Sequence, residues 1–239
     1  MINKPCFLIS CEHATAYVPP VYQSLFKDHD SVLATHRAYD LGASEVAHSL
    51  AETLGCSAIY GQVSRLVIDL NRSLSHRGVW SSFSRSLSAE QKKDLIHGYY
   101  LPYREKFASL VTSCLAQYQT VIHLSIHSFT PILGEQVRQA EIGLLYDPAY
   151  PEEKIFAEAW KKHLSVALAE YRIRMNYPYQ GKSDGFTNTL RKTYQGRGYI
   201  GIELEMNQAV VYDLFFKKSV VETVIRMNER WLPEQDSNL

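Results

Sequence analysis

Short apolar runs alternate along the chain with longer segments in which apolar residues recur every three or four positions. Apolar runs bounded by polar or turn-forming residues are typical of buried strands, and the longer pattern is typical of helices. The runs predict strands at residues 7–11, 57–60, 66–70, 120–126, 141–146 and 199–206. The longer segments predict helices at residues 40–54, 88–119, 151–171 and 209–231. This alternation is typical of βαβ units and predicts a single α/β domain, residues 1–239, in which helices flank a mainly parallel mixed sheet.

Particular residues mark the predicted helix ends. Gly55 ends the first helix, because glycine readily adopts the left-handed conformation that terminates a helix. Ser88 followed by Gln91 has the spacing of a capping box at the start of the second helix, and Pro102 predicts a break or kink inside it. The polar residues 233–239 predict a frayed tail.

The composition excludes several classes of protein. The chain has 46% hydrophobic and 21% charged residues, which are ordinary globular values. Its 25 Lys+Arg balance 25 Asp+Glu, so we expect neither a nucleic-acid partner nor an anionic membrane surface. No apolar run is long enough for a membrane span or a signal peptide. The four cysteines form no C-x-x-C pair, so we expect reduced thiols and a cytoplasmic location.

Polar side chains follow the ends of four predicted strands. In open α/β sheets, functional groups gather just past the carboxyl ends of the strands. We therefore expect one site that combines metal-binding or acid/base groups with a clamp for an anion. The residues concerned are Glu12 and His13, Asn71 and Arg72, His127 and Ser128, and Glu205, Met206 and Asn207.

Two histidines are candidate metal ligands. His127 lies at the mouth of its strand, whereas His123 lies deeper on the same face and is interpreted as a buried structural histidine. His13 follows the first strand and offers a second imidazole. A catalytic zinc takes about three protein ligands, so a carboxylate is needed. Asp40 and Glu12 compete, and Asp40 is preferred because a regular strand would point Glu12 and His13 to opposite faces. The alternative for Asp40 is a plain helix N-cap.

The side chains of Asn71 and Arg72 are suited to bind the carboxylate of a substrate. A guanidinium binds a carboxylate through two parallel hydrogen bonds, and a neighbouring amide fixes its plane. Arg65, at the start of the same predicted strand, is a further candidate. The alternative is a structural ion pair between Arg72 and an acid such as Asp69.

Glu203 and Glu205 share one face of the last predicted strand. Glu205 lies nearer the carboxyl end, so it is the preferred general base, and Glu203 is expected to pair with an arginine or support a ligand. The alternative is that both glutamates lie on the solvent-exposed face of an edge strand. Residues 179–191 form a long polar segment with two glycines, which we predict to be a loop that closes over a ligand.

Taken together, these segments resemble the N-formylglutamate amidohydrolase family. The resemblance extends over most of the chain, in the order of the family. The matching pieces are SCEHA at 10–14, YDLGA at 39–43, SRLVIDLNR at 64–72, IHSFTP at 126–131, GKSDG at 181–185 and LEMN at 204–207.

The resemblance implies a fold like that of zinc exopeptidases, a group that includes the carboxypeptidases and aspartoacylases. It implies one Zn²⁺ ion, with His127 as the second zinc histidine and Glu205 as the general base. It also places Asn71 and Arg72 in the segment that grips the substrate carboxylate, and Lys182 in a further matching segment as a substrate-binding candidate. The relatives carry their first ligands as His-x-x-Glu, and this chain departs from that pattern because Ala16 stands three residues after His13.

These observations favour a zinc-dependent amidohydrolase that cleaves a small N-acyl amino acid such as N-formyl-L-glutamate. In this interpretation His13, Asp40 and His127 hold the metal, and Glu205 moves the proton. Two alternatives remain. One is a metal-free protein that binds or senses a small acid on the same scaffold. The other is a hydrolase of similar mechanism that acts on a peptide or cell-wall amide.

Overall fold

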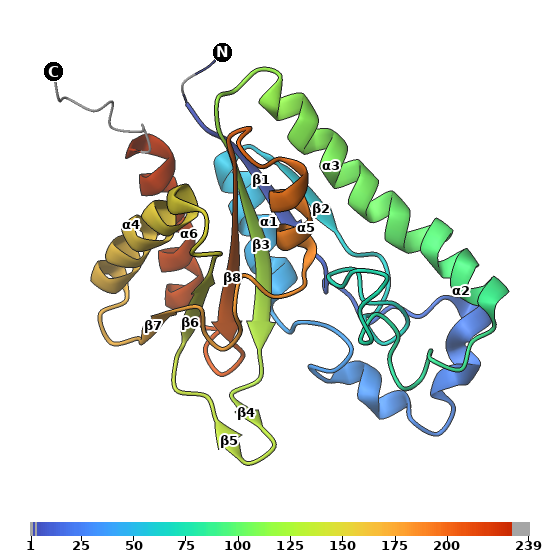
Figure 1. Cartoon of the computed structure of the whole chain (residues 1–239). Helices are drawn as coiled ribbons and strands as arrows, with labels where there is room; N and C mark the ends of the chain where they lie inside the picture. The colour runs from blue at the N-terminus through green and yellow to red at the C-terminus, as the bar shows by residue number, and fades with distance from the viewer. Residues whose placement is uncertain (1, 3, 231–239) are drawn as a thin grey trace, which may run out of the picture.

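A six-stranded sheet forms the centre of the computed structural model, which describes residues 2 and 4–230 (Figure 1). Its strand order is β2-β1-β3-β8-β6-β7. Four neighbouring strands, β2, β1, β3 and β8, are parallel, β6 runs antiparallel to β8, and β7 is parallel to β6. The predicted α/β domain with a mainly parallel mixed sheet is confirmed. The strands are β1 (Cys6–Cys11), β2 (Ser57–Tyr60), β3 (Val121–Phe129), β6 (Ile142–Leu145), β7 (Ile173–Met175) and β8 (Tyr199–Asn207).

The two central strands, β3 and β8, are buried along their whole length. Parallel strands that are covered on both faces read as nearly continuous apolar runs, which is why the sequence pattern located them. The parallel register sets His127 of β3 directly beside Glu205 of β8. The predicted polar residues therefore meet at one edge of the sheet.

Helices cover both faces of the sheet (Figure 1). On one face α1 (Ala43–Leu54), α4 (Pro151–Ala167) and α6 (Leu214–Arg230) pack Leu50, Trp160 and Phe216 into one apolar core. On the other face α3 (Leu101–Leu115) and α5 (Phe186–Thr193) contribute Phe107 and Phe186 to a second core. Because side chains alternate along a strand, Ile122, Leu124 and Ile126 of β3 face the first core. His123 between them faces the second core, where its ring lies against Phe107 and Phe186.

The helix boundaries follow the predicted signals. Gly55 ends α1 in the left-handed conformation, and Ser88 forms a capping box with Gln91 at the start of α2 (Ala89–Leu95). The predicted break near Pro102 is a π-helical turn, Ile96–Tyr100, that leads directly into α3. The predicted frayed tail at 233–239 lies outside the described residues.

The strand predicted at residues 66–70 is wrong. This segment is buried but folds as successive turns, in which Val67 N–H donates to the Ser64 carbonyl and Asp69 N–H donates to the Val79 carbonyl. A short apolar run is compatible with any buried backbone whose polar groups find partners. The predicted loop at 179–191 is wrong in its second half, which forms α5.

Smaller elements lie outside the sheet. Two 3₁₀ helices, η1 (Pro20–Phe26) and η2 (Asp30–Ala34), precede α1, and a hairpin of β4 (Ile132–Leu133) and β5 (Gln136–Val137) follows β3. All four cysteines are unpaired. Among the described residues, none of the helices has the length and apolar character needed to cross a bilayer.

Candidate active site

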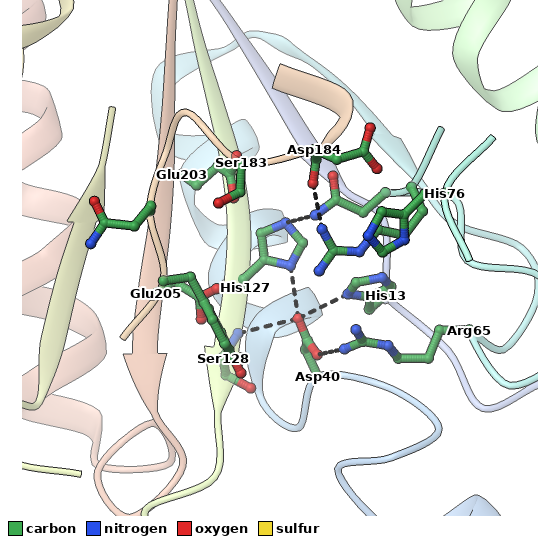
Figure 2. Close-up of a pocket in the computed structure, with 14 residues that line it drawn as sticks. His13, Asp40, Arg65, His76, His127, Ser128, Ser183, Asp184, Glu203 and Glu205 are labelled. Atoms are coloured by element: carbon green, nitrogen blue, oxygen red, sulfur yellow. Dashed lines mark hydrogen bonds and ion pairs between the residues drawn. The ribbon is translucent and has the colours of Figure 1, made fainter. Parts of the chain in front are cut away.

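A cavity of about 330 Å³ opens at the carboxyl ends of β1, β3 and β8. Figure 2 shows side chains from these strand ends and from the neighbouring loops converging on it. Most of the residues that line the cavity are polar or charged, in keeping with a site for a polar ligand. They are His13, Asp40, Arg65, Asn71, Arg72, His76, His127, Ser128, Tyr179, Gln180, Ser183, Asp184, Glu203 and Glu205.

The three predicted metal ligands come together in this cavity. Oδ2 of Asp40 lies 3.3 Å from Nδ1 of His13 and 2.8 Å from Nδ1 of His127 (Figure 2). Potential ligand atoms of the three residues lie within 4.8 Å of one another, and all three side chains are buried. Two imidazoles and one carboxylate form a donor set that suits a divalent transition metal.

The backbone before α1 places Asp40 in the cluster. Asp40 N–H donates to the His13 carbonyl over 3.0 Å, which ties this segment to the end of β1. Gly42, two residues later, has a φ of 76°, and it occupies the N-cap position of α1. This left-handed conformation favours glycine. Asp40 itself is therefore not the helix cap.

A second carboxylate lies behind each histidine. Nε2 of His13 lies 2.7 Å from Oδ1 of Asp69, and Nε2 of His127 lies 3.0 Å from Oε2 of Glu12. Carboxylates of this kind orient metal-binding imidazoles and fix their tautomers. Glu12, the competing candidate for third ligand, thus lies on the far side of the His127 ring from Asp40. Its two oxygens also accept hydrogen bonds from Tyr103 and Ser125.

The charges of this cluster are strongly coupled. Burial lowers the pKa of His127, but hydrogen bonds to Asp40 and Glu12 outweigh this effect and raise it well above its ordinary value. Burial alone would raise the pKa of Asp40, yet the charges and hydrogen bonds of His13 and His127 lower it well below its usual range. Asp40 is therefore an anion, as a metal ligand must be.

Glu205 is the carboxylate best suited to move a proton. Its side chain is buried at the edge of the cavity, and its Oε2 has no hydrogen-bond partner among the described residues. Burial raises the pKa of Glu205 to about 8, and the charges of Asp40 and Glu203 add to this effect. A carboxyl group whose pKa lies near neutrality can both accept and return a proton.

Glu203 accepts a hydrogen bond from the Thr187 hydroxyl. Because β8 lies inside the sheet, this pair does not form the face of an edge strand.

Asn71 and Arg72 reach the cavity although their segment is not a strand. Arg72 Nη1 donates to the backbone carbonyl of Asp184, and Asn71 Oδ1 accepts from Phe186 N–H over 2.7 Å. The alternative ion pair between Arg72 and Asp69 does not form. Asp69 instead binds His13 and Arg65, so the guanidinium of Arg72 has no acidic partner among the described residues.

Arg65 and Lys182 differ from Arg72 in their surroundings. Arg65 lines the cavity, but its two terminal nitrogens contact Asp40 at 3.2 Å and Asp69 at 3.4 Å. It therefore bridges the acids around His13. Lys182 is exposed and is not among the residues that line the cavity.

A buried ion pair anchors the 181–185 loop, which brings Asp184 to Arg72. Arg191 Nε lies 2.7 Å from Oε1 of Glu153, and its Nη1 donates to the Gly181 carbonyl over 2.8 Å. Both side chains are almost fully buried. A charged group at such a depth needs partners of this kind, so the pair holds the loop against α4.

Sequence reasoning missed several residues of the site. The sequence pattern offers Asp69 only as a partner for Arg72, although it lies in the matching segment 64–72, and its contact with His13 depends on the fold. The sequence pattern places Ser128 and Ser183 near the site, beside His127 and in the predicted loop at 179–191, but gives neither of them a role. Tyr179 begins the predicted loop at 179–191, whereas His76 lies in an irregular segment to which nothing in the sequence pattern points.

The fold and the site define a class: an α/β protein with a buried histidine–carboxylate cluster at the carboxyl ends of its parallel strands. The family model of N-formylglutamate amidohydrolase matches residues 6–212, and the chain belongs to this family. Family membership makes it an amidohydrolase.

Solved structures share this fold. A gene product of Agrobacterium tumefaciens is 27% identical with a TM-score of 0.78, over 95% of this chain and 88% of that chain. The N-formylglutamate amidohydrolase of Ralstonia eutropha JMP134 has the same fold, at 14% identity and a TM-score of 0.68, over 93% of this chain and 92% of that chain. None of the curated proteins matches the sequence.

Proposed function

We propose that this protein is a zinc-dependent amidohydrolase that cleaves a small N-acyl amino acid, with N-formyl-L-glutamate as the first substrate to test. The convergence of His13, Asp40 and His127 beside the unpartnered carboxylate of Glu205 carries the proposal. A cavity of about 330 Å³ is within the size range of small-molecule sites.

The residues present fit a zinc ion. His13 and His127 would bind through Nδ1 and Asp40 through Oδ2, because these atoms converge and both Nε2 atoms already have carboxylate partners. Three protein ligands leave a further coordination position, as catalytic zinc sites require. When bound, the metal would polarise the amide carbonyl and lower the pKa of water.

The chain's own residues would then complete the chemistry. Glu205 takes a proton from the attacking water at its free Oε2 and returns it to the departing amine nitrogen. Arg72 and Asn71 orient the substrate through its carboxylate, since both line the cavity and Arg72 has no acidic partner among the described residues. Holding the amide near these groups lowers the entropic part of the barrier.

Metal analysis and a hydrolysis assay test this function. We expect the purified protein to hold about one zinc ion per chain and to release formate from N-formyl-L-glutamate. A chelator should abolish the activity, and added zinc should restore it. Tight binding of small acids without metal or turnover would instead indicate a metal-free binding protein. If the protein hydrolyses only peptide or cell-wall amides, it is instead a hydrolase of similar mechanism with a larger substrate.

We also propose that the whole chain forms one catalytic domain and works in a reducing compartment such as the cytoplasm. The one central six-stranded sheet and the unpaired state of all four cysteines support this.

A further inference from the structure

A second cavity of about 300 Å³ lies next to the active-site cavity. We name it the arginine cavity, because Arg37, Arg65 and Arg138 line it. The two cavities share Asp40, Arg65, Ser128 and Tyr179. In Figure 2 the shared edge is marked by Ser128, Asp40 and Arg65, and Asp184, the partner of Arg72, lies on the opposite side of His127.

Arg138 is buried in this cavity without an acidic partner. Its side chain is 7% exposed, and its guanidinium lies over the rings of Phe129 and Tyr179 at 5.4 and 5.1 Å. Nη2 donates to the Tyr179 hydroxyl over 2.9 Å, but the buried Nη1 has no hydrogen-bond partner among the described residues. A buried donor without a partner costs free energy, which a ligand that accepts from it would recover.

The charge of the arginine cavity is strongly positive. Asp40 is the acidic residue in its lining, and its carboxylate already contacts His13, His127 and Arg65. Arg37 and Arg138 have no ion pair among the described residues. His36 lies in the same lining, and burial together with the charges of Arg37, Arg65 and Arg138 lowers its pKa, so it is a neutral neighbour. Two unpaired guanidiniums therefore face a cavity of suitable size for a carboxylate.

The relation of the two cavities defines what this anion could be. Arg72 lines only the active-site cavity, and Arg138 lines only the arginine cavity. A ligand whose amide lies at the His13–Asp40–His127 cluster can thus extend toward Arg72 on one side and across Ser128 toward Arg138 on the other.

We propose that the arginine cavity binds a second carboxylate of the substrate, with Arg138 as its main donor and Arg37 as a supporting charge. This rests on the proposed function, in which Arg72 holds the first carboxylate. When N-formyl-L-glutamate is bound, each of its two carboxylates then has its own arginine, and Arg138 is the residue that selects for the second one.

Binding of N-formyl-L-glutamate and its two monoamides, N-formyl-L-glutamine and N-formyl-L-isoglutamine, tests the proposal. Calorimetric titrations are made with the zinc-loaded Glu205→Gln protein, in which turnover is slow. Arg138→Met and Arg72→Lys are each added to this background. Arg197→Met is the matched control, because Arg197 also lies over a tyrosine ring, that of Tyr194, but lines neither cavity.

We expect Arg138→Met to weaken binding of N-formyl-L-glutamate about ten- to hundred-fold, the worth of one lost charge-assisted pair. Arg138→Met should weaken the binding of one monoamide much less than that of N-formyl-L-glutamate, and Arg72→Lys should do the same for the other monoamide. Arg197→Met should change nothing. Three results would overturn the proposal. Arg138→Met could weaken the binding of all three ligands equally, it could weaken none of them, or Arg138→Met and Arg72→Lys could both spare the same monoamide.

Two further measurements keep the outcome decisive. If circular dichroism shows that Arg138→Met does not fold, the exposed Arg37→Met is used, which should weaken N-formyl-L-glutamate severalfold and spare one monoamide. No effect there counts against the arginine cavity. Formate release by the wild-type protein is measured separately. Absence of turnover together with the expected binding pattern would refute the proposed function and leave the second carboxylate site standing.

Discussion

The carboxylate of Glu12 lies 3.0 Å from Nε2 of His127, while Nδ1 of the same ring lies 2.8 Å from Asp40. The imidazole is thus held between two acids, one behind it and one inside the candidate metal cluster. A proton on Nε2 that is donated to Glu12 leaves the Nδ1 lone pair free for a metal.

Glu12→Gln should weaken metal binding by about 10- to 100-fold, the usual effect of losing a carboxylate behind a metal-binding histidine. Zinc affinity is measured by competition with a chromogenic chelator. Glu52→Gln, at an exposed position of α1, is the control and should bind zinc normally. If Glu12→Gln bound zinc with unchanged affinity, Glu12 would have a packing role and would not orient His127 for the metal.

His127→Ala should remove metal binding and activity while the fold remains intact, because it deletes one of three ligands. His123 lies four residues earlier on β3 and is its natural comparison. Its ring bonds the Ser10 and Tyr199 hydroxyls at 2.7 and 2.6 Å, and burial lowers its pKa to about 3. His123→Ala should therefore lower the melting temperature but keep zinc in the folded fraction. If instead His123→Ala lost zinc and His127→Ala kept it, as measured by metal content and circular dichroism, His123 would be the ligand and His127 the structural histidine.

The sequence pattern predicted those parts of the site that depend on local periodicity. Alternation along β3 separates His127 from Leu124 and Ile126, and parallel strands bring His127 and Glu205 to one edge. The alternation that would set Glu12 and His13 on opposite faces does not apply, because both residues lie in a turn beyond the end of β1.

The rest depends on contacts between distant segments. The turns at 66–70 are stabilised by partners far along the chain, such as Arg104, which donates to the Leu70 carbonyl over 3.0 Å. Arg138 reaches the arginine cavity from the segment after the β4–β5 hairpin, and no periodic pattern marks it. Local propensity does not encode such pairings, so they required the structure.

Glu205→Gln should retain zinc and lose about 10²–10⁴-fold in kcat, the typical contribution of a positioned acid/base group. The amide keeps the shape of the side chain but cannot accept the proton of water. Steady-state kinetics at saturating N-formyl-L-glutamate, with zinc content measured in parallel, decides. Nearly normal turnover would shift the base role to another carboxylate, with Glu203 as the first to examine.

The stability of the metal-free protein should depend on pH through Glu205. Burial raises the pKa of Glu205 from an ordinary 4.5 to about 8, so the folded state favours the protonated form. The associated stability is fully present below pH 4.5 and is lost as the pH rises toward 8. Glu205→Gln should therefore become progressively more stable than wild type over this range. Urea unfolding at several pH values, with chelator present, measures it. A constant difference between the two proteins would show that the carboxyl group titrates normally.

Arg72→Lys should weaken the binding of acidic substrates more than it slows their turnover. Lysine keeps the charge but loses the planar fork that matches a carboxylate. Reducing a bidentate contact to a single one costs about 1.5–3 kcal/mol, which is roughly a ten- to hundred-fold rise in KM if KM follows binding. The effect should largely disappear for the substrate analogue in which the carboxylate held by Arg72 is an uncharged amide. Two enzymes and two substrates thus give four KM values, whose ratio isolates the contact. Because Arg72 Nη1 also donates to the Asp184 carbonyl, the substitution could instead disturb the 181–185 loop. In that case both substrates would suffer equally, and Arg72 would be a support of the loop and not the residue that recognises the acid.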